Sequence, residues 1–194
     1  MSKYIYAVAC IGLFFAACSK KENPTPVSIE YVQLNNATVT TDQSVNIDLD
    51  KDGTVDFLVT KELRETAAGQ DDLLEFRVVS GQQHKLLVQQ DGTPARKEPG
   101  VWIRKENEGA FQWDASQHAV VVTRVLTIDL ANAYWQGTWK DQYNKYLPVQ
   151  LIKEGKTYNG WIQISFSPIL PSRIIVHDAA FNKVAGEPIQ AGNK

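Results

Sequence analysis

Residues 45–59 read Val45-Asn-Ile-Asp48-Leu-Asp50-Lys-Asp52-Gly53-Thr54-Val-Asp56-Phe-Leu-Val59, and this stretch decides the fold. On both sides of its acidic middle, apolar side chains alternate with other residues: Val45, Ile47 and Leu49 come before it, and Val55, Phe57 and Val59 come after it. A period of two places such side chains on one face of an extended strand. We therefore predict a β-hairpin, in which two antiparallel strands flank a loop from Asp48 to Asp56.

The loop carries aspartates at its first, third, fifth and ninth positions and a glycine at its sixth. Calcium takes about six to eight oxygen ligands, and glycine permits the sharp turn that such a loop needs. We predict one bound calcium ion, held by the side chains of Asp48, Asp50, Asp52 and Asp56 and by the carbonyl of Thr54. The loop is not a complete EF-hand, because Val59 stands where the bidentate glutamate would be. The alternative is a solvated acidic turn that Gly53 and Asx-type hydrogen bonds close without an ion.

The chain from Ser28 onward predicts further short strands between turn signals. The strand candidates are Leu73–Val79, Lys85–Gln89, Ala119–Leu130, Leu147–Lys153, Thr157–Ser167 and Arg173–His177. One short helix is predicted over Ala131–Gln142, although Gly137 in its middle disfavours it by about 1 kcal/mol relative to alanine. Many short strands without alternating helices favour an all-β fold, an antiparallel β-sandwich of jelly-roll type.

Composition limits the classes of protein that fit this chain. The 194 residues are 43% hydrophobic and 22% charged, which fits one globular domain. The net charge of -2, with both signs interspersed, gives no basic surface for a nucleic acid, so we expect no nucleic-acid partner. Cys10 and Cys18 are the only cysteines, so the sequence after Cys18 provides neither a disulfide nor a cysteine metal site.

The amino terminus predicts export. Lys3 precedes an apolar run from Tyr4 to Phe15, which is too short to span a membrane and is typical of a signal peptide. The following Ala16-Ala17-Cys18 resembles the lipobox of bacterial lipoproteins, which implies that Cys18 is lipidated and becomes the first mature residue. The alternative is plain secretion, with cleavage near Ala17 and a free thiol.

We predict a lipoprotein signal peptide over residues 1–17, a lipidated tether over residues 18–27 and a single β-sandwich domain over residues 28–194. Prolines at positions 24 and 26 favour an extended tether. The lipobox resemblance implies a membrane partner, reached through the lipid. Ser19 is not the aspartate that is linked to inner-membrane retention in well-studied lipoproteins, which implies the outer membrane, facing either the periplasm or the cell surface.

The last third of the chain resembles a set of secreted bacterial domains, most of them uncharacterised. The matching residues are Tyr146-Leu147-Pro148-Val149, Gly160-Trp161-Ile162, Asp178-Ala179-Ala180-Phe181 and Gly186-Glu187-Pro188-Ile189-Gln190-Ala191-Gly192. Members of that set also tend to carry an acidic Asp-x-Asp-x-Asp-Gly hairpin near their start, as this chain does. The resemblance implies an architecture, and no activity comes with it.

An aromatic cluster gives a second hypothesis. Trp135, Trp139 and Tyr143 are spaced four residues apart, and Tyr146 follows. If these rings are exposed on one flat face, they can stack on sugars, which predicts a glycan-binding accessory protein with a polysaccharide partner. The alternative is that the rings pack in the core, which is the more frequent position of tryptophan.

Catalysis has little support in the sequence. The histidines at 84, 118 and 177 are scattered and show no local metal-ligand spacing. The carboxylates of Asp72, Glu75, Glu106 and Glu108 form a catalytic pair only if the fold brings two of them together. We therefore expect a non-catalytic binding or structural lipoprotein of the cell envelope with a structural calcium site, whose partner is an envelope protein or, in the alternative, a polysaccharide.

Overall fold

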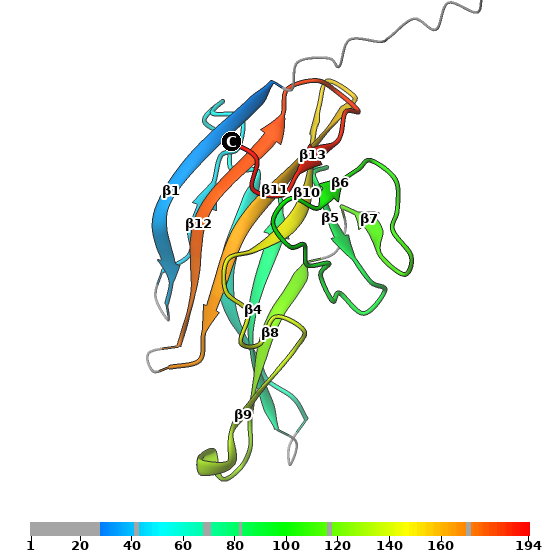
Figure 1. Ribbon diagram of the computed structural model, residues 1–194. Coiled ribbons are helices and arrows are strands. Elements are labelled where there is room, and N and C mark those ends of the chain that lie inside the picture. The colour runs from blue at the N-terminus through cyan, green and yellow to red at the C-terminus, as the bar shows by residue number, and fades with distance from the viewer. Residues whose placement is uncertain (1–27, 41–42, 68–70, 82, 116–117, 170–171) are drawn as a thin grey trace, which may run out of the picture.

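The computed structural model describes residues 28–40, 43–67, 71–81, 83–115, 118–169 and 172–194. The predicted signal peptide, Cys18 and the tether lie outside the described residues. The described residues form two packed antiparallel sheets, which confirms the predicted all-β sandwich (Figure 1). In this part of the chain, no helix is long and apolar enough to cross a membrane.

The larger sheet contains six strands among the described residues. Their order across the sheet is β1 (Ile29–Val39), β12 (Arg173–Asn182), β11 (Lys156–Ser167), β10 (Lys145–Lys153), β5 (Lys85–Val88) and β7 (Gln112–Asp114). Consecutive hairpins build its centre from β10, β11 and β12, and β1 returns to pair with β12. Gly160 lets β11 and β12 approach closely, because a Cβ atom there would lie 2.6 Å from the carbonyl oxygen of Ala180.

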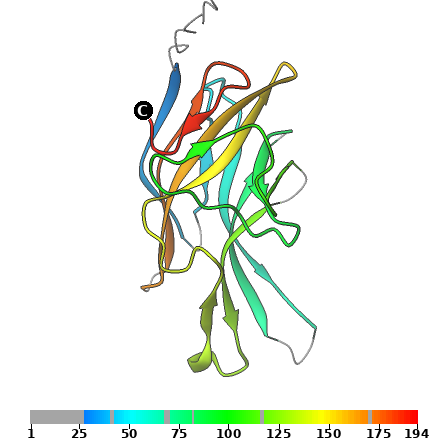
Figure 2. The ribbon, with the colours of Figure 1, turned by 45° about the vertical axis from the view of Figure 1, so that its right-hand side comes forward.

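The smaller sheet contains five strands in the described residues. Their order is β2 (Val45–Ile47), β3 (Phe57–Arg64), β4 (Asp72–Ser80), β8 (Ala119–Leu126) and β9 (Tyr134–Gln136). Figure 2 shows this sheet beside the larger one, with the β8–β9 hairpin extending beyond the body of the sandwich. The hairpin connection contains a single 3-10 turn, η1 (Leu130–Asn132), and the side chain of Asp129 accepts a hydrogen bond from the amide of Ala131 at its start.

The predicted helix over Ala131–Gln142 is wrong. The segment contains the last two residues of η1 and the three residues of β9, and Gly137, with a φ of +118°, leads into a turn over residues 138–141. The backbone of β9 pairs with β8 in register, with Trp135 opposite Arg124. Pairing with a neighbouring strand and burial of the Trp135 ring against the core outweigh a weak helix propensity.

The main core lies between the sheets and confirms most of the predicted alternation. Ile47, Leu49, Phe57 and Val59 are fully buried in it. Val55 is an exception with 40% exposure, because it still belongs to the loop and β3 begins only at Phe57. Burial of apolar side chains on both sides of the acidic loop therefore fixes the two ends of the hairpin.

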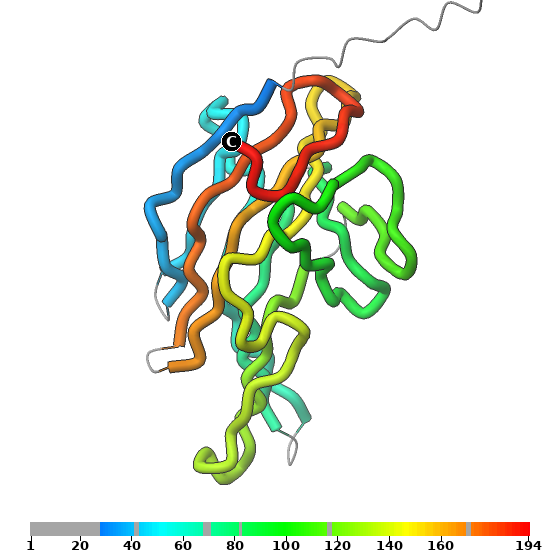
Figure 3. Tube along the Cα trace, in the orientation of Figure 1, coloured from blue at the N-terminus to red at the C-terminus, as the bar shows by residue number. Residues whose placement is uncertain are grey.

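A two-stranded ribbon covers the outer face of the larger sheet. It consists of β6 (Trp102–Ile103) and β13 (Ile189–Gln190), and Figure 3 shows the red C-terminal segment beside the green segment that contains β6. A second apolar cluster lies beneath it, formed by Ile103, Tyr146, Trp161, Ala180, Ile189 and Ala191. The last residue, Lys194, donates hydrogen bonds to the Tyr31 hydroxyl at 2.8 Å and to Asp178 at 3.0 Å, which raises the pKa of Lys194 to about 12.

Candidate metal centre

The acidic loop joins β2 to β3, which confirms the predicted hairpin. Val45 pairs with Val59, and Ile47 pairs with Phe57. The amide of Asp56 donates a hydrogen bond to the carbonyl of Ile47 at 2.9 Å and so closes the loop at its base. The loop is therefore held by a backbone hydrogen bond at its ends and by core packing directly below it.

Backbone amides orient the first carboxylate of the loop. Oδ1 of Asp48 accepts a hydrogen bond from the amide of Asp52 at 3.1 Å, and Oδ2 accepts one from the amide of Gly53 at 2.8 Å. Gly53 has a φ of +91°, which a residue with a side chain rarely adopts. The glycine thus allows the turn that brings its own amide to Asp48.

Three of the predicted ligands converge. Asp48, Asp50 and Asp56 each place a carboxylate oxygen within 4.8 Å of the other two, so the group could hold a metal ion. The side chains of Asp50 and Asp56 are only 8% and 4% exposed. Like charges this close repel one another, and burial removes the water that would screen them. An all-oxygen group of this kind suits hard cations such as calcium and magnesium.

Asp52 is not part of the three-carboxylate group. It is exposed, and its Oδ1 accepts a hydrogen bond from the amide of Thr54 at 2.8 Å, which lowers the pKa of Asp52. Asp52 thus forms the Asx-type turn that the alternative of a solvated acidic turn predicts, whereas the other three aspartates form the acidic group that the calcium prediction requires. The role of the Thr54 carbonyl as a ligand stays a prediction.

Two basic side chains from distant parts of the sequence complete the site. Nζ of Lys153, at the end of β10, donates a hydrogen bond to Oδ2 of Asp50 at 2.6 Å, which raises the pKa of Lys153. Nε2 of His84, between β4 and β5, lies 2.8 Å from Oδ1 of Asp56. Oδ2 of Asp56 accepts a hydrogen bond from the amide of Leu49 at 2.6 Å. No local motif marks Lys153 or His84, and only the packing of the two sheets brings them to the loop.

The aromatic residues do not form the flat exposed face that sugar stacking would need. Trp139 is fully buried, and its Nε1 donates a hydrogen bond to the carbonyl of Pro94 at 3.4 Å. Trp135 is half-buried and meets Phe166 edge to face, with ring centroids 4.8 Å apart. Tyr143 alone of the three is exposed. The hypothesis of glycan stacking on this cluster is therefore wrong, because Trp139 is buried in the core and Trp135 packs against it.

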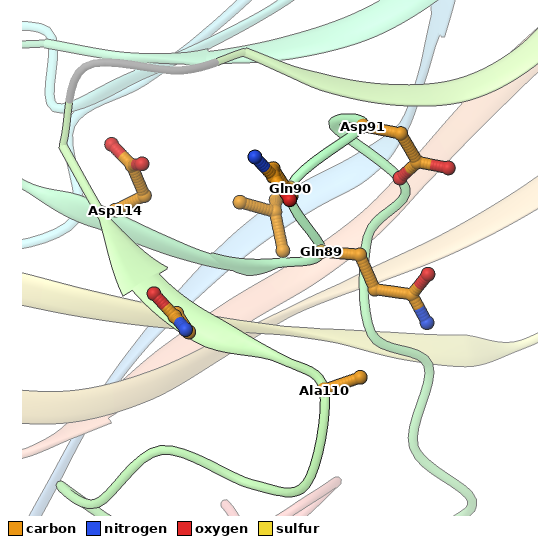
Figure 4. A pocket seen from close by; sticks show the side chains of 7 residues that line it. Gln89, Gln90, Asp91, Ala110 and Asp114 are labelled. Atoms are coloured by element: carbon orange, nitrogen blue, oxygen red, sulfur yellow. The ribbon is translucent and has the colours of Figure 1, made fainter.

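A separate polar pocket of about 610 Å³ lies between the end of β5 and β7. Figure 4 shows the side chains around it, and the lining residues are Val88, Gln89, Gln90, Asp91, Ala110, Gln112 and Asp114. Side-chain amides both donate and accept hydrogen bonds, while carboxylates accept them. The pocket thus offers the groups that a ligand rich in hydroxyls requires, in a place that the spacing of aromatic residues did not indicate.

Three of the four carboxylates considered for catalysis have structural contacts, and the fourth, Glu106, is exposed. Glu75 is buried and pairs with Arg77 at 3.1 Å and with Arg64 at 3.3 Å. Glu108 pairs with Lys97, and Asp72 accepts a hydrogen bond from the amide of Thr66 at 3.0 Å. These contacts account for the three side chains as structural ion pairs and caps.

No protein-family model matches the sequence, and no curated protein or solved structure matches it. The similarity to secreted bacterial domains stays a prediction. What the fold and the site define is a class: an all-β sandwich with an acidic group at one hairpin that could hold a metal ion.

Proposed function

We propose that this protein is a non-catalytic lipoprotein of the cell envelope that binds one calcium ion in its β2–β3 hairpin as a structural clamp. The observation that carries the calcium site is the convergence of Asp48, Asp50 and Asp56 within 4.8 Å. A divalent cation between them would offset the repulsion of three carboxylates, two of which are almost fully buried. Extracellular calcium sites bind with dissociation constants of about 10⁻⁴ to 10⁻³ M, which suits a brace and not a signalling switch.

The position of the loop supports a role near the proposed anchor. Lys51 of the loop forms an ion pair with Glu30, the second residue of β1. The chain that precedes β1 is the predicted tether to Cys18. A calcium clamp in this loop would therefore stabilise the end of the sandwich to which the lipid anchor is attached.

Thermal unfolding of the full chain tests the calcium site. Calcium at ten times its dissociation constant should add about 1.4 kcal/mol to the free energy of unfolding, and chelator should reverse the gain. Asp50→Asn should abolish the gain. Asp91→Asn is the matched control, because Asp91 accepts the amide of Thr93 in the same kind of turn as Asp52 and lies outside the group. An unfolding curve that is the same in calcium and in chelator would refute the site.

The anchor needs its own experiment. Cys18→Ser should move the protein from the membrane fraction to the soluble fraction and should prevent incorporation of a labelled fatty acid. A serine variant that stays in the membrane fraction would show that another feature holds the protein there. This result bears on the anchor alone and leaves the calcium site unaffected.

The polar pocket favours polysaccharide capture as a second candidate function. Its three glutamine side chains suit the hydroxyl groups of a neutral glycan, and its volume lies within the roughly 300 to 1,000 Å³ that is usual for ligand pockets. Affinity electrophoresis in gels that contain a neutral polysaccharide tests this candidate. Gln90→Ala with Gln112→Ala should abolish retardation, whereas Gln43→Ala, an exposed glutamine near β2, should not. If no polysaccharide retards the wild-type protein, this candidate is wrong.

A further inference from the structure

His84 is a buried residue whose two ring nitrogens face different parts of the fold. Its side chain is 4% exposed, and its ring packs beside Phe57 with centroids 5.7 Å apart. Nδ1 faces β10, where the amide of Ile152 donates a hydrogen bond to it at 3.0 Å. Nε2 points into the acidic group, 2.8 Å from Oδ1 of Asp56. Within the described part of the chain, Nε2 makes no hydrogen bond of good geometry, and Asp56 is the acceptor that lies within reach of it.

The Ile152 amide decides which nitrogen carries the proton. A nitrogen that accepts a hydrogen bond must present a lone pair, so Nδ1 is unprotonated and the neutral ring carries its proton on Nε2. The opposite tautomer would set the N–H of Nδ1 against the N–H of Ile152. Nε2 therefore presents a hydrogen to Asp56 and has no lone pair to offer a metal ion.

We infer that His84 is a positioning residue that fixes Asp56 as an oxygen ligand and keeps imidazole out of the metal's coordination shell. The site should then select hard cations, calcium or magnesium, over zinc, which prefers nitrogen and sulfur ligands. A histidine beside three aspartates would otherwise give a set of ligands suited to zinc or other transition metals. This inference rests on the proposed function, because it needs a cation at the acidic group.

Two variants test the contacts of Nε2 and Nδ1 separately. His84→Gln places an amide NH₂ near the position of Nε2, so it keeps a donor for Asp56 and loses the acceptor for Ile152. His84→Asn places an amide oxygen near the position of Nδ1, so it keeps the acceptor for Ile152 and loses the donor for Asp56. Calorimetric titration of the full chain with calcium should give similar affinities for wild type and His84→Gln, and an affinity about tenfold lower for His84→Asn.

Zinc and the ring protons provide the second measurement. Zinc should not displace calcium at equal concentration, and the long-range nitrogen NMR spectrum of His84 should show the proton on Nε2 with and without calcium. Equal calcium affinities for the two variants would reduce His84 to a packing role and overturn the inference. Zinc that displaces calcium and shifts the Nε2 resonance would overturn it as well. If wild type binds neither calcium nor magnesium, the proposed site fails and the inference fails with it.

Discussion

Asp56→Asn is the substitution that tests the geometry of the site most directly. The side chain keeps its shape and loses its charge. The amide of Leu49 donates a hydrogen bond to Oδ2 at 2.6 Å, and Nε2 of His84, which carries the ring proton in the inferred tautomer, lies 2.8 Å from Oδ1. An asparagine has one acceptor oxygen and one NH₂ group, so it can accept from one of these donors and must turn its own donor toward the other.

The expected loss of stability in Asp56→Asn follows from that mismatch of donors and acceptors. One buried donor is left without an acceptor, which costs about 1 to 3 kcal/mol. Relief of repulsion from Asp48 and Asp50 acts in the opposite direction, so the lower half of this range is expected in chelator. For a chain of this size, about 2 to 4 °C of melting temperature corresponds to each kcal/mol. In calcium the variant should lose the wild-type gain in addition, so its deficit should widen.

Differential scanning calorimetry in chelator and in calcium measures both effects. Asp50→Asn is the informative comparison, because the Asp50 side chain contacts an exposed lysine and a loop amide, and loss of these contacts leaves no buried donor among the described residues. Asp50→Asn should therefore melt close to wild type in chelator, whereas Asp56→Asn should not. If Asp56→Asn melts like wild type in chelator, then the N–H of His84 Nε2 does not depend on Asp56 as its acceptor, and the inferred role of His84 is wrong.

Three further predictions concern other contacts. Gly192→Ala should destabilise the protein by about 1 to 3 kcal/mol in urea unfolding, because φ is +84° and the new Cβ would lie 2.7 Å from the buried Tyr146 hydroxyl. Gly186→Ala, which has a φ of +79° and open space around the new Cβ, should lose less stability, and equal losses would exclude the Tyr146 contact as the cause. Desolvation lowers the pKa of His177 in the folded protein below its usual 6.5, so on acidification the unfolded chain binds the proton at higher pH than the folded protein does. The free energy of unfolding should therefore be highest above about pH 6.5 and should decrease as the pH falls below it. His177→Asn should flatten that fall in melting temperature, the exposed His118→Asn should not, and an unchanged slope in the His177 variant would contradict the assignment. Lys153→Met should bind calcium more tightly than wild type in calorimetric titration, because the positive charge paired with Asp50 is removed. Lys145→Met should leave the calcium affinity unchanged, because Lys145 is at the other end of β10, roughly 26 Å away at about 3.3 Å per residue. Weaker binding by the Lys153 variant would show that this lysine supports the site.

The sequence predicted the strands that are mostly apolar runs between turn signals. β4, β10 and β11 lie within a few residues of their predicted ranges. Alternate residues of β10, Leu147, Val149 and Leu151, enter the main core, and Tyr146, just before Leu147, is buried in the second cluster on the other face. β1 interrupts its own alternation: Asn35 and Asn36 adopt φ of 53° and 58°, and its register with β12 shifts between Gln33 and Ala37. The ribbon strands β6 and β13 have two residues each, too few for a period to be recognised.

The residues of the candidate site also differ in whether the sequence alone could identify them. Spacing within one loop was enough to select Asp48, Asp50 and Asp56, because neighbours in a nine-residue loop cannot lie far apart. It also selected Asp52, whose side chain turns to the Thr54 amide, since a local hydrogen bond competes with an ion for the same carboxylate. His84 and Lys153 reach the loop only because the two sheets pack together, and no residue spacing in the sequence predicts that packing.

The contacts of the loop indicate what a cation there would stabilise. Lys51 connects the loop to β1 through Glu30, and Lys153 connects Asp50 to the end of β10. His84 connects Asp56 to the amide of Ile152, also in β10. The loop itself belongs to the smaller sheet, whereas β1 and β10 belong to the larger one. A cation that fixes Asp56 would therefore strengthen the connection to β10 through His84, and its effect on stability would extend beyond the hairpin that binds it.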